Sequence, residues 1–224
     1  MEKNYKLIPL VILAGGRSSR MGTPKGLLTV EKKTWIESHL ENYAKLGGKE
    51  VYLVLGHRKK EYLDGISWLK NALDEFHLTP YGVQVKVVTN VNPDLGPFSS
   101  LQSAGRELDQ RIDWRGVFVL PVDQFFPNQE VWDGLVKDAF DYEACVPRDV
   151  IEQKGGHPVF LSADYLRTLI EIPDGHFHAR LDFQLRALPE DRIHFVEVSD
   201  SKTFTNVNNL KEFWDAMQEN RDLG

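Results

Sequence analysis

A loop rich in glycine and positive charge follows the first apolar segment of the chain. Residues 14–26 have the sequence Ala-Gly-Gly-Arg-Ser-Ser-Arg-Met-Gly-Thr-Pro-Lys-Gly, in which Arg17, Arg20 and Lys25 are the cations. Glycine lets backbone N–H groups approach an anion closely. Arginine can fork two phosphate oxygens, and lysine acts as a mobile point charge. These residues predict a cradle for a polyphosphate.

Two familiar phosphate-binding patterns do not occur in this loop. A P-loop has Ser or Thr after its lysine, whereas Gly26 follows Lys25, and the dinucleotide pattern G-x-G-x-x-G is absent. The alternative is a flexible glycine turn with solvated basic side chains. The position of the loop directly after an apolar segment favours the cradle.

A carboxylate follows a second apolar segment. Residues 117–120, Val-Phe-Val-Leu, lead into Pro121-Val122-Asp123. Mg²⁺ prefers hard oxygen ligands and usually takes few of them from the protein, and a bound divalent metal neutralises charge on phosphates. Asp123 is therefore a candidate metal ligand. Its alternative is an ordinary turn or helix-capping aspartate.

The first loop also carries a family resemblance. Leu13-Ala14-Gly15-Gly16-x-Ser18-x-Arg20-Met21-Gly22-x-x-Lys25 resembles the signature loop of the NTP transferase domain in nucleotidyltransferases like the molybdenum cofactor guanylyltransferase and cytidylyltransferase. The resemblance implies that the backbone of residues 13–16 (Leu13, Ala14, Gly15 and Gly16) faces the base and phosphates. It implies that Arg20 and Lys25 hold the triphosphate and the attacking phosphate, and that Asp123 binds Mg²⁺.

Two more segments resemble the nucleotide and metal sites of that family. Asn90, Ser99 and Ser100 fall in a stretch like the family's Asn-Pro…Gly…Ser-Leu segment, which contacts the nucleotide. Ser99 has ordinary helix capping as its alternative. The Asn206-Val-Asn208 run resembles the family's Asn-x-Asn before the last helix, so we expect Asn208 first and Asn206 second as metal or water-shell ligands, with helix capping as the alternative.

The acceptor side rests on weaker patterns. Gly156-His157-Pro158 resembles the family's Gly-His-Pro segment, which lies near the acceptor substrate. Arg180, after a predicted loop tip, is expected to face the acceptor as well. A structural histidine is the alternative for His157. It is not expected to be a general base, since an attacking phosphate is already ionised and catalysis is then positioning and electrostatics. His176 and His178 are expected to be solvated loop residues.

Some residues depart from the family pattern and bear on the choice of base. Leu55 stands where the guanylyltransferase has a nucleotide-contacting Asn, and Asn90 stands where it has an Asp. Gly15 and the Asn-x-Asn run are typical of guanylyl transfer, whereas Ser99-Ser100-Leu101 and the His157 segment are more like the cytidylyl branch. GTP is therefore favoured over CTP.

These residues must be positioned by alternating strands and helices. The apolar pattern predicts strands over 7–13, 51–55, 83–88, 117–120, 143–146, 158–161 and 193–198, and helices over 34–46, 61–75, 98–108, 128–140, 162–170, 179–188 and 208–220. This alternation indicates an α/β fold in three α/β/α layers around a mostly parallel, Rossmann-like sheet. We expect one domain over 1–224, with a nucleotide-binding part near 6–125 and an acceptor-binding part near 126–224. Ligands should bind at the carboxyl ends of the strands.

Composition narrows the classes of protein. The chain has 224 residues and a net charge of −6, which disfavours a general nucleic-acid binder. No apolar run approaches a membrane span, and Cys145, the single cysteine, is expected to be buried and inert. We expect a cytoplasmic protein that is a monomer or a weak homo-oligomer.

The sequence as a whole predicts an Mg²⁺-dependent nucleotidyltransferase. It would move GMP from GTP onto a phosphorylated acceptor, molybdopterin, and release pyrophosphate. One alternative is CTP-dependent transfer to molybdopterin, and another is transfer to a sugar 1-phosphate or other phosphorylated metabolite. A third is a nucleotide-binding relative without activity, which the departures at Leu55 and Asn90 support.

Overall fold

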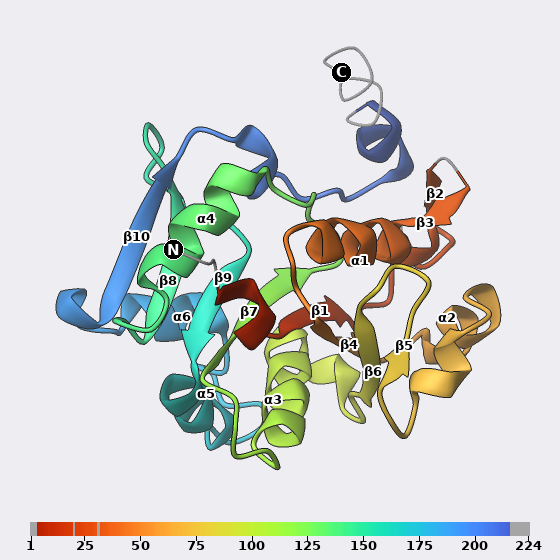
Figure 1. The fold of residues 1–224 in the computed structure, drawn as a ribbon, viewed down its shortest axis with the longest axis horizontal. Helices are drawn as coiled ribbons and strands as arrows, with labels where there is room; N and C mark the ends of the chain where they lie inside the picture. Colours follow the sequence, from red (N-terminus) through yellow and green to blue (C-terminus); the bar gives the residue numbers. More distant parts are fainter. Residues whose placement is uncertain (1–3, 20, 31, 216–224) are drawn as a thin grey trace.

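An eight-stranded sheet forms the centre of the molecule (Figure 1). The computed structural model describes residues 4–19, 21–30 and 32–215. The strand order is β10-β8-β9-β7-β1-β4-β6-β5. β1 runs parallel to β4 and β7, β4 to β6, and β8 to β10, whereas β5 and β9 are antiparallel to their neighbours. The predicted mostly parallel α/β sheet is confirmed. The strands are β1 (Leu10–Ala14), β4 (Glu50–Leu55), β5 (His77–Leu78), β6 (Gln84–Thr89), β7 (Gly116–Pro121), β8 (Ala144–Asp149), β9 (Val159–Ser162) and β10 (Ile193–Val198).

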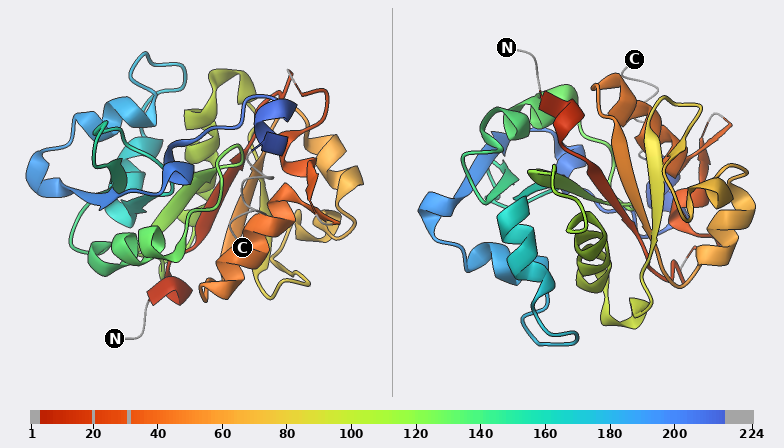
Figure 2. Two further views of the ribbon diagram at one scale, coloured as in Figure 1. Left: turned by 90° about the horizontal axis from the view of Figure 1, so that it is seen from above. Right: turned by 60° about the horizontal axis from the view of Figure 1, so that its bottom comes forward.

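Helices cover both faces of the sheet. α1 (Trp35–Lys45) and α4 (Gln129–Asp138) lie on one face, and α3 (Pro97–Leu108) and α5 (Ala163–Ile170) lie on the other (Figures 1 and 2). Successive residues of a strand point to opposite faces of the sheet, so each strand contributes to the hydrophobic core on both faces. In β1, Leu10 and Ile12 pack with α1 and α4, whereas Val11 packs with α3 and α5. A strand buried on both faces has the continuous apolar sequence seen here.

Capping residues fix where three helices begin. Thr34 and Glu37 form a reciprocal capping box at α1. Asn128 accepts a hydrogen bond from the Val131 N–H at α4, and Ser162 accepts one from the Tyr165 N–H at α5. Each satisfies an N–H group that lacks a partner within the helix.

The predicted bounds were wrong in several places. The first strand begins at Leu10, after the 3₁₀ helix η1 (Asn4–Leu7), because Pro9 has no N–H for a strand ladder. The predicted helix 61–75 is divided into α2 (Lys59–Gly65) and η3 (Leu69–Ala72), because the chain turns extended at Ile66 after Gly65. The helix predicted over 179–188 is only α6 (Leu181–Arg186), since Arg180 is extended.

The shortest strands were not predicted from the sequence pattern. The hairpin β2 (Thr29–Val30) and β3 (Lys33–Thr34) and the two-residue β5 are too short to give a periodic signal. The last helix begins at Leu210 and is described as far as residue 215, so the predicted end at 220 lies outside the described residues.

Candidate active site

The loops after β1, β4 and β6 pack against one another at the carboxyl edge of the sheet. The carbonyl of Gly15 accepts a hydrogen bond from the His57 N–H at 3.2 Å. A Cβ atom on Gly15 would lie 2.7 Å from Ser100 Oγ, and one on Gly56 would lie 2.6 Å from the Gly15 carbonyl and 2.8 Å from Pro93 Cβ. Glycine is therefore required here by close approach of the three loops.

This contact predicts a stability effect that can be measured. Gly15→Ala should lower the free energy of unfolding by about 1–3 kcal/mol, because its Cβ overpacks against the buried Ser100 hydroxyl. Adding Ser100→Ala should restore most of the loss, since it removes the clashing oxygen. Gly16→Ala is the matched control, because a Cβ there meets no atom within 4 Å. Urea unfolding of the variants checks this, and equal losses for Gly15→Ala and Gly16→Ala would contradict it.

Lys25 and Asp123 meet although they are far apart in the sequence. Lys25 opens the 3₁₀ helix η2 (Lys25–Leu27), and its Nζ lies 3.0 Å from Asp123 Oδ2. Both side chains are largely buried, with 15% and 29% exposed. The Lys25 N–H donates to Ser18 Oγ at 3.2 Å, and the Asp123 carbonyl accepts from the Val207 N–H at 2.8 Å. The structure thus brings two predicted catalytic residues together. The third, Arg20, lies outside the described residues.

Two cavities adjoin this ion pair. The small cavity has a volume of about 180 Å³, and the large cavity has about 920 Å³. Both are lined by Leu13, Pro97, Pro121 and Asp123, so Asp123 stands where they meet. The small cavity is also lined by the predicted residues Ala14, Gly15, Gly16, Lys25 and Ser100. The large cavity is lined by the predicted residues His157, Arg180 and Asn206.

His157 belongs to the large cavity and also has a structural role. Its Nδ1 lies 3.3 Å from the carbonyl oxygen of Val119, and burial lowers the pKa of its imidazole. Pro158 is buried and lies outside both cavity linings. A neutral imidazole held by the sheet suits a wall of the cavity.

The segment before the last helix lies beside Asp123. An antiparallel bridge joins Asn206 to Gln124, next to the hydrogen bond from Val207 to Asp123. The exposed Asn206 lines the large cavity, whereas Asn208 lines neither cavity and donates its side-chain N–H to the Asn206 carbonyl at 3.3 Å. Asn209 caps the last helix by accepting from the Glu212 N–H at 3.0 Å.

Comparison with known proteins places this arrangement in a family. The family model for the MobA-like NTP transferase domain matches residues 10–188. The chain belongs to this family. It is a nucleotidyltransferase, and its fold is similar to that of solved structures.

Three relatives illustrate the likeness. A protein of Methanosarcina mazei named "Probable molybdenum cofactor guanylyltransferase" is 28% identical over 220 residues, covering 94% of this chain and 90% of its own. A solved nucleotidyl transferase from Methanothermobacter has a TM-score of 0.72 at 22% identity, with 97% of this chain and 99% of its own covered. A solved molybdopterin-guanine dinucleotide biosynthesis protein A from Archaeoglobus fulgidus has a TM-score of 0.63 at 17% identity, with 96% and 100% covered.

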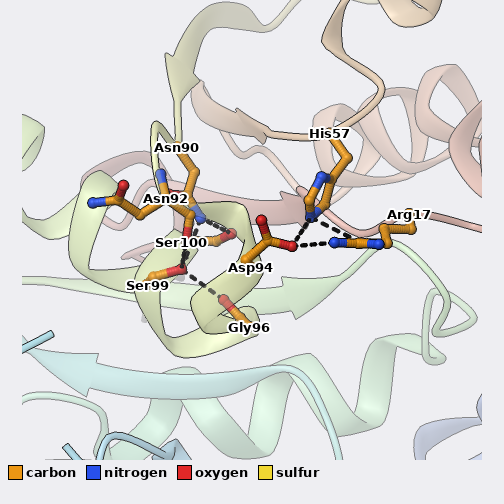
Figure 3. Close-up of polar contacts among 8 residues, drawn as sticks. All are labelled: Arg17, His57, Asn90, Asn92, Asp94, Gly96, Ser99 and Ser100. Atoms are coloured by element: carbon orange, nitrogen blue, oxygen red, sulfur yellow. Dashed lines mark hydrogen bonds and ion pairs between the residues drawn. The ribbon is translucent and has the colours of Figure 1, made fainter. Parts of the chain in front are cut away.

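Asn90 and Ser99 occupy a buried polar cluster in this transferase (Figure 3). The Asn90 Nδ2 donates to Ser99 Oγ at 2.8 Å and to Ser100 Oγ at 3.0 Å, and its Oδ1 accepts from the Asn92 N–H at 2.9 Å. Ser99 donates to the Gly96 carbonyl instead of capping α3. Neither Asn90 nor Ser99 lines a cavity. They hold loop 90–96 in place, and Ser100 alone of the three predicted residues reaches the small cavity.

An exposed charged cluster joins the first and third loops of the transferase (Figure 3). Arg17 is ion-paired with Asp94, and His57 Nε2 lies 3.4 Å from the same carboxylate oxygen. The Arg17 guanidinium lowers the pKa of the Asp94 carboxyl. Neither Asp94 nor His57 was predicted as a site residue. The available signal is Leu55, two residues before His57, which stands where the family resemblance leads us to expect a nucleotide-contacting Asn.

The remaining predictions concern Arg180, two loop histidines and the cysteine. Arg180 forms two hydrogen bonds of 3.0 Å to Asp182, and His176 and His178 are exposed as predicted. Cys145 is buried, and burial raises the pKa of its thiol to about 12.

Within the described residues, no three His, Cys, Asp or Glu side chains converge as a metal cluster. No helix among them has the length and apolar character needed to span a bilayer.

Proposed function

We propose that this nucleotidyltransferase transfers GMP from GTP to the phosphate of a molybdopterin acceptor. The observation that carries the proposal is the Lys25–Asp123 pair, 3.0 Å apart at the meeting point of two cavities. One cavity would take the triphosphate and the other the acceptor, which is the arrangement a group transfer between two substrates requires. The Methanosarcina relative named as a probable molybdenum cofactor guanylyltransferase supports the choice of substrates.

The proposed reaction is a displacement at phosphorus. An acceptor phosphate oxygen attacks the α-phosphorus of GTP, and the bond from that phosphorus to the bridging oxygen breaks. Pyrophosphate leaves with the electron pair. The attacking phosphate is already ionised, so Lys25 contributes by stabilising charge on the phosphates rather than by moving a proton. His157 is held neutral against Val119 and serves as cavity wall.

The residues at the junction fit a divalent metal. Asp123 Oδ2 is paired with Lys25, whereas no partner contacts Oδ1 among the described residues, so one carboxylate oxygen is available. Mg²⁺ takes one or two carboxylates and fills its shell with water and substrate phosphates, which suits a single carboxylate. When bound, the metal would neutralise charge at the α-phosphate. We propose Asp123 with Asn206, ahead of Asn208, because only Asn206 lines the large cavity.

The charge and size of the large cavity support a phosphorylated, bulky acceptor. Four basic side chains line it against two acidic ones: Arg148, Lys154, Arg180 and Arg186 against Asp123 and Asp182. A volume of about 920 Å³ is near the upper end of the about 300–1,000 Å³ of ligand pockets. This favours a fused-ring acceptor over a sugar 1-phosphate. The pairing of Lys25 with Asp123 speaks against the inactive-relative alternative.

The cavity linings also support the proposed division of the chain. The small cavity takes its lining from residues 13–123, within the nucleotide-binding part proposed for 6–125. The large cavity takes most of its lining from residues 146–206, within the acceptor-binding part proposed for 126–224. Both parts contribute strands to one sheet, so we propose a single unit over 1–224.

Ligand-dependent melting tests the nucleotide. The purified protein is heated with GTP, CTP, ATP or UTP, each with and without Mg²⁺. A nucleotide at 100 times its Kd adds about 2.7 kcal/mol to the free energy of unfolding and raises the Tm. We expect an Mg²⁺-dependent rise with GTP, followed by pyrophosphate release when molybdopterin is added. A rise in Tm with CTP alone would show that the protein is a cytidylyltransferase instead. Pyrophosphate release only with sugar 1-phosphates would show that the acceptor is not molybdopterin.

A further inference from the structure

Tyr62, which neither the motif analysis nor the proposed function uses, reaches the small cavity. It belongs to α2, and its ring is buried in the main core with 1% exposed. Its hydroxyl accepts a hydrogen bond from the Gly26 N–H at 3.3 Å, directly after Lys25. Tyr62 lines the small cavity together with Lys25, Ser18 and Asp123. A phenol from the core thus stands among the groups expected to hold phosphate.

The Tyr62 ring packs against the backbone that follows Lys25. A Cβ on Gly26 would lie 2.9 Å from Tyr62 Cε1 and 2.6 Å from Ile36 Cδ1, so ring and backbone are in direct contact. This packing and the hydrogen bond from the Gly26 N–H hold the hydroxyl beside the backbone that carries Lys25. Such a fixed donor costs little conformational entropy when a ligand binds.

The Tyr62 hydroxyl has an O–H donor that makes no hydrogen bond among the described residues. A tyrosine hydroxyl accepts through its lone pairs and donates one O–H. The Gly26 N–H uses a lone pair, and no acceptor for the O–H contacts Tyr62 among the described residues. Burial raises the pKa of the phenol well above its ordinary value, so the proton stays in place at neutral pH. The O–H is therefore able to donate a hydrogen bond to a group that enters the small cavity.

The small cavity indicates which ligand supplies that acceptor. Its volume of about 180 Å³ is below the about 300 Å³ at which pockets for whole small molecules begin, so it suits phosphate groups rather than a complete nucleotide. Lys25 and the glycine backbone of residues 15–16 offer further donors from the same lining. We propose that the Tyr62 hydroxyl donates its proton in a hydrogen bond to a phosphate oxygen of the nucleoside triphosphate. This inference rests on the proposed function.

Tyr62→Phe tests the contact because it removes only the hydroxyl. Because hydrogen bonds to charged groups are strong, its loss should raise the Kd for Mg²⁺–GTP by about 10- to 100-fold. Calorimetry measures this Kd. If the protein binds both GTP and CTP, the Kd should rise by the same factor for each, because the contact is to phosphate and not to the base. Tyr43→Phe is the matched control: it removes another buried hydroxyl, which bonds the Ile8 carbonyl away from both cavities. It should lower the Tm and leave the Kd unchanged.

A second measurement separates direct contact from loop positioning. If Tyr62 acts only by placing Lys25, Tyr62→Phe will cost nothing further in a Lys25→Met background. A direct phosphate contact predicts that a loss in affinity persists there. Wild-type protein that binds Mg²⁺–GTP no more tightly than Tyr62→Phe would overturn this inference alone. Wild-type protein that binds no nucleoside triphosphate would overturn the proposed function, and the inference with it.

Discussion

Asp123→Asn should lower turnover by about 10³-fold while the protein stays folded. The substitution keeps the size of the side chain and removes the carboxylate charge that both the proposed metal and Lys25 face. Loss of one preorganised electrostatic group at a reacting centre costs about 10²–10³-fold, and the proposed metal would also lose the carboxylate proposed as its ligand. Pyrophosphate release with GTP and molybdopterin measures the loss.

A surface pair of the same geometry provides the control. Lys70 Nζ lies 3.0 Å from Asp64 Oδ1, as Lys25 lies from Asp123, but these side chains are 59% and 54% exposed. Asp64→Asn should change turnover and Tm little, because exposed ion pairs contribute about 0–1 kcal/mol. Asp123→Asn should also abolish the Mg²⁺-dependent part of the Tm rise with GTP. Turnover at the wild-type rate in Asp123→Asn would remove Asp123 from the metal site.

The sequence predicted the edge of the sheet at which the site lies. Apolar segments ending near Leu13, Val88 and Leu120 lead into unusual loops, and parallel strands bring their carboxyl ends to one edge. The periodicity of the apolar residues and the handedness of crossover connections are enough to predict this edge. The contact between Lys25 and Asp123 needs more, since 98 residues separate them. Only the family resemblance placed both on the same substrate.

Which polar side chains face a ligand could not be predicted, because burial depends on packing. Asn90 and Ser99 are residue types that often contact nucleotides, yet both form hydrogen bonds to other groups of the protein. Tyr62 gives the opposite case. It falls within the predicted helix 61–75, in which no site residue was predicted, yet Tyr62 lines the small cavity and its ring packs on Gly26. Neither outcome is visible in a pattern of apolar spacing.

Lys25→Met should lower kcat/KM for GTP by about 10²-fold or more, for a reason distinct from that of Asp123→Asn. Methionine keeps the aliphatic stem, which is mostly buried, and removes the ammonium. The phosphates then lose a preorganised positive charge in a site sheltered from water. Lys70→Met, on the exposed pair with Asp64, is the control that should leave kcat/KM unchanged.

The two substitutions should differ in their effect on the metal. Without the Lys25 ammonium, both Asp123 oxygens are free of a competing cation, so the Kd for Mg²⁺ or Mn²⁺ should stay equal or fall although turnover falls. In Asp123→Asn the same Kd should rise. Because the two groups act on one transition state, the double variant should be little slower than the slower single variant. Strictly additive losses, or weaker metal binding in Lys25→Met, would show that Lys25 and Asp123 do not act as one unit on the reacting phosphates.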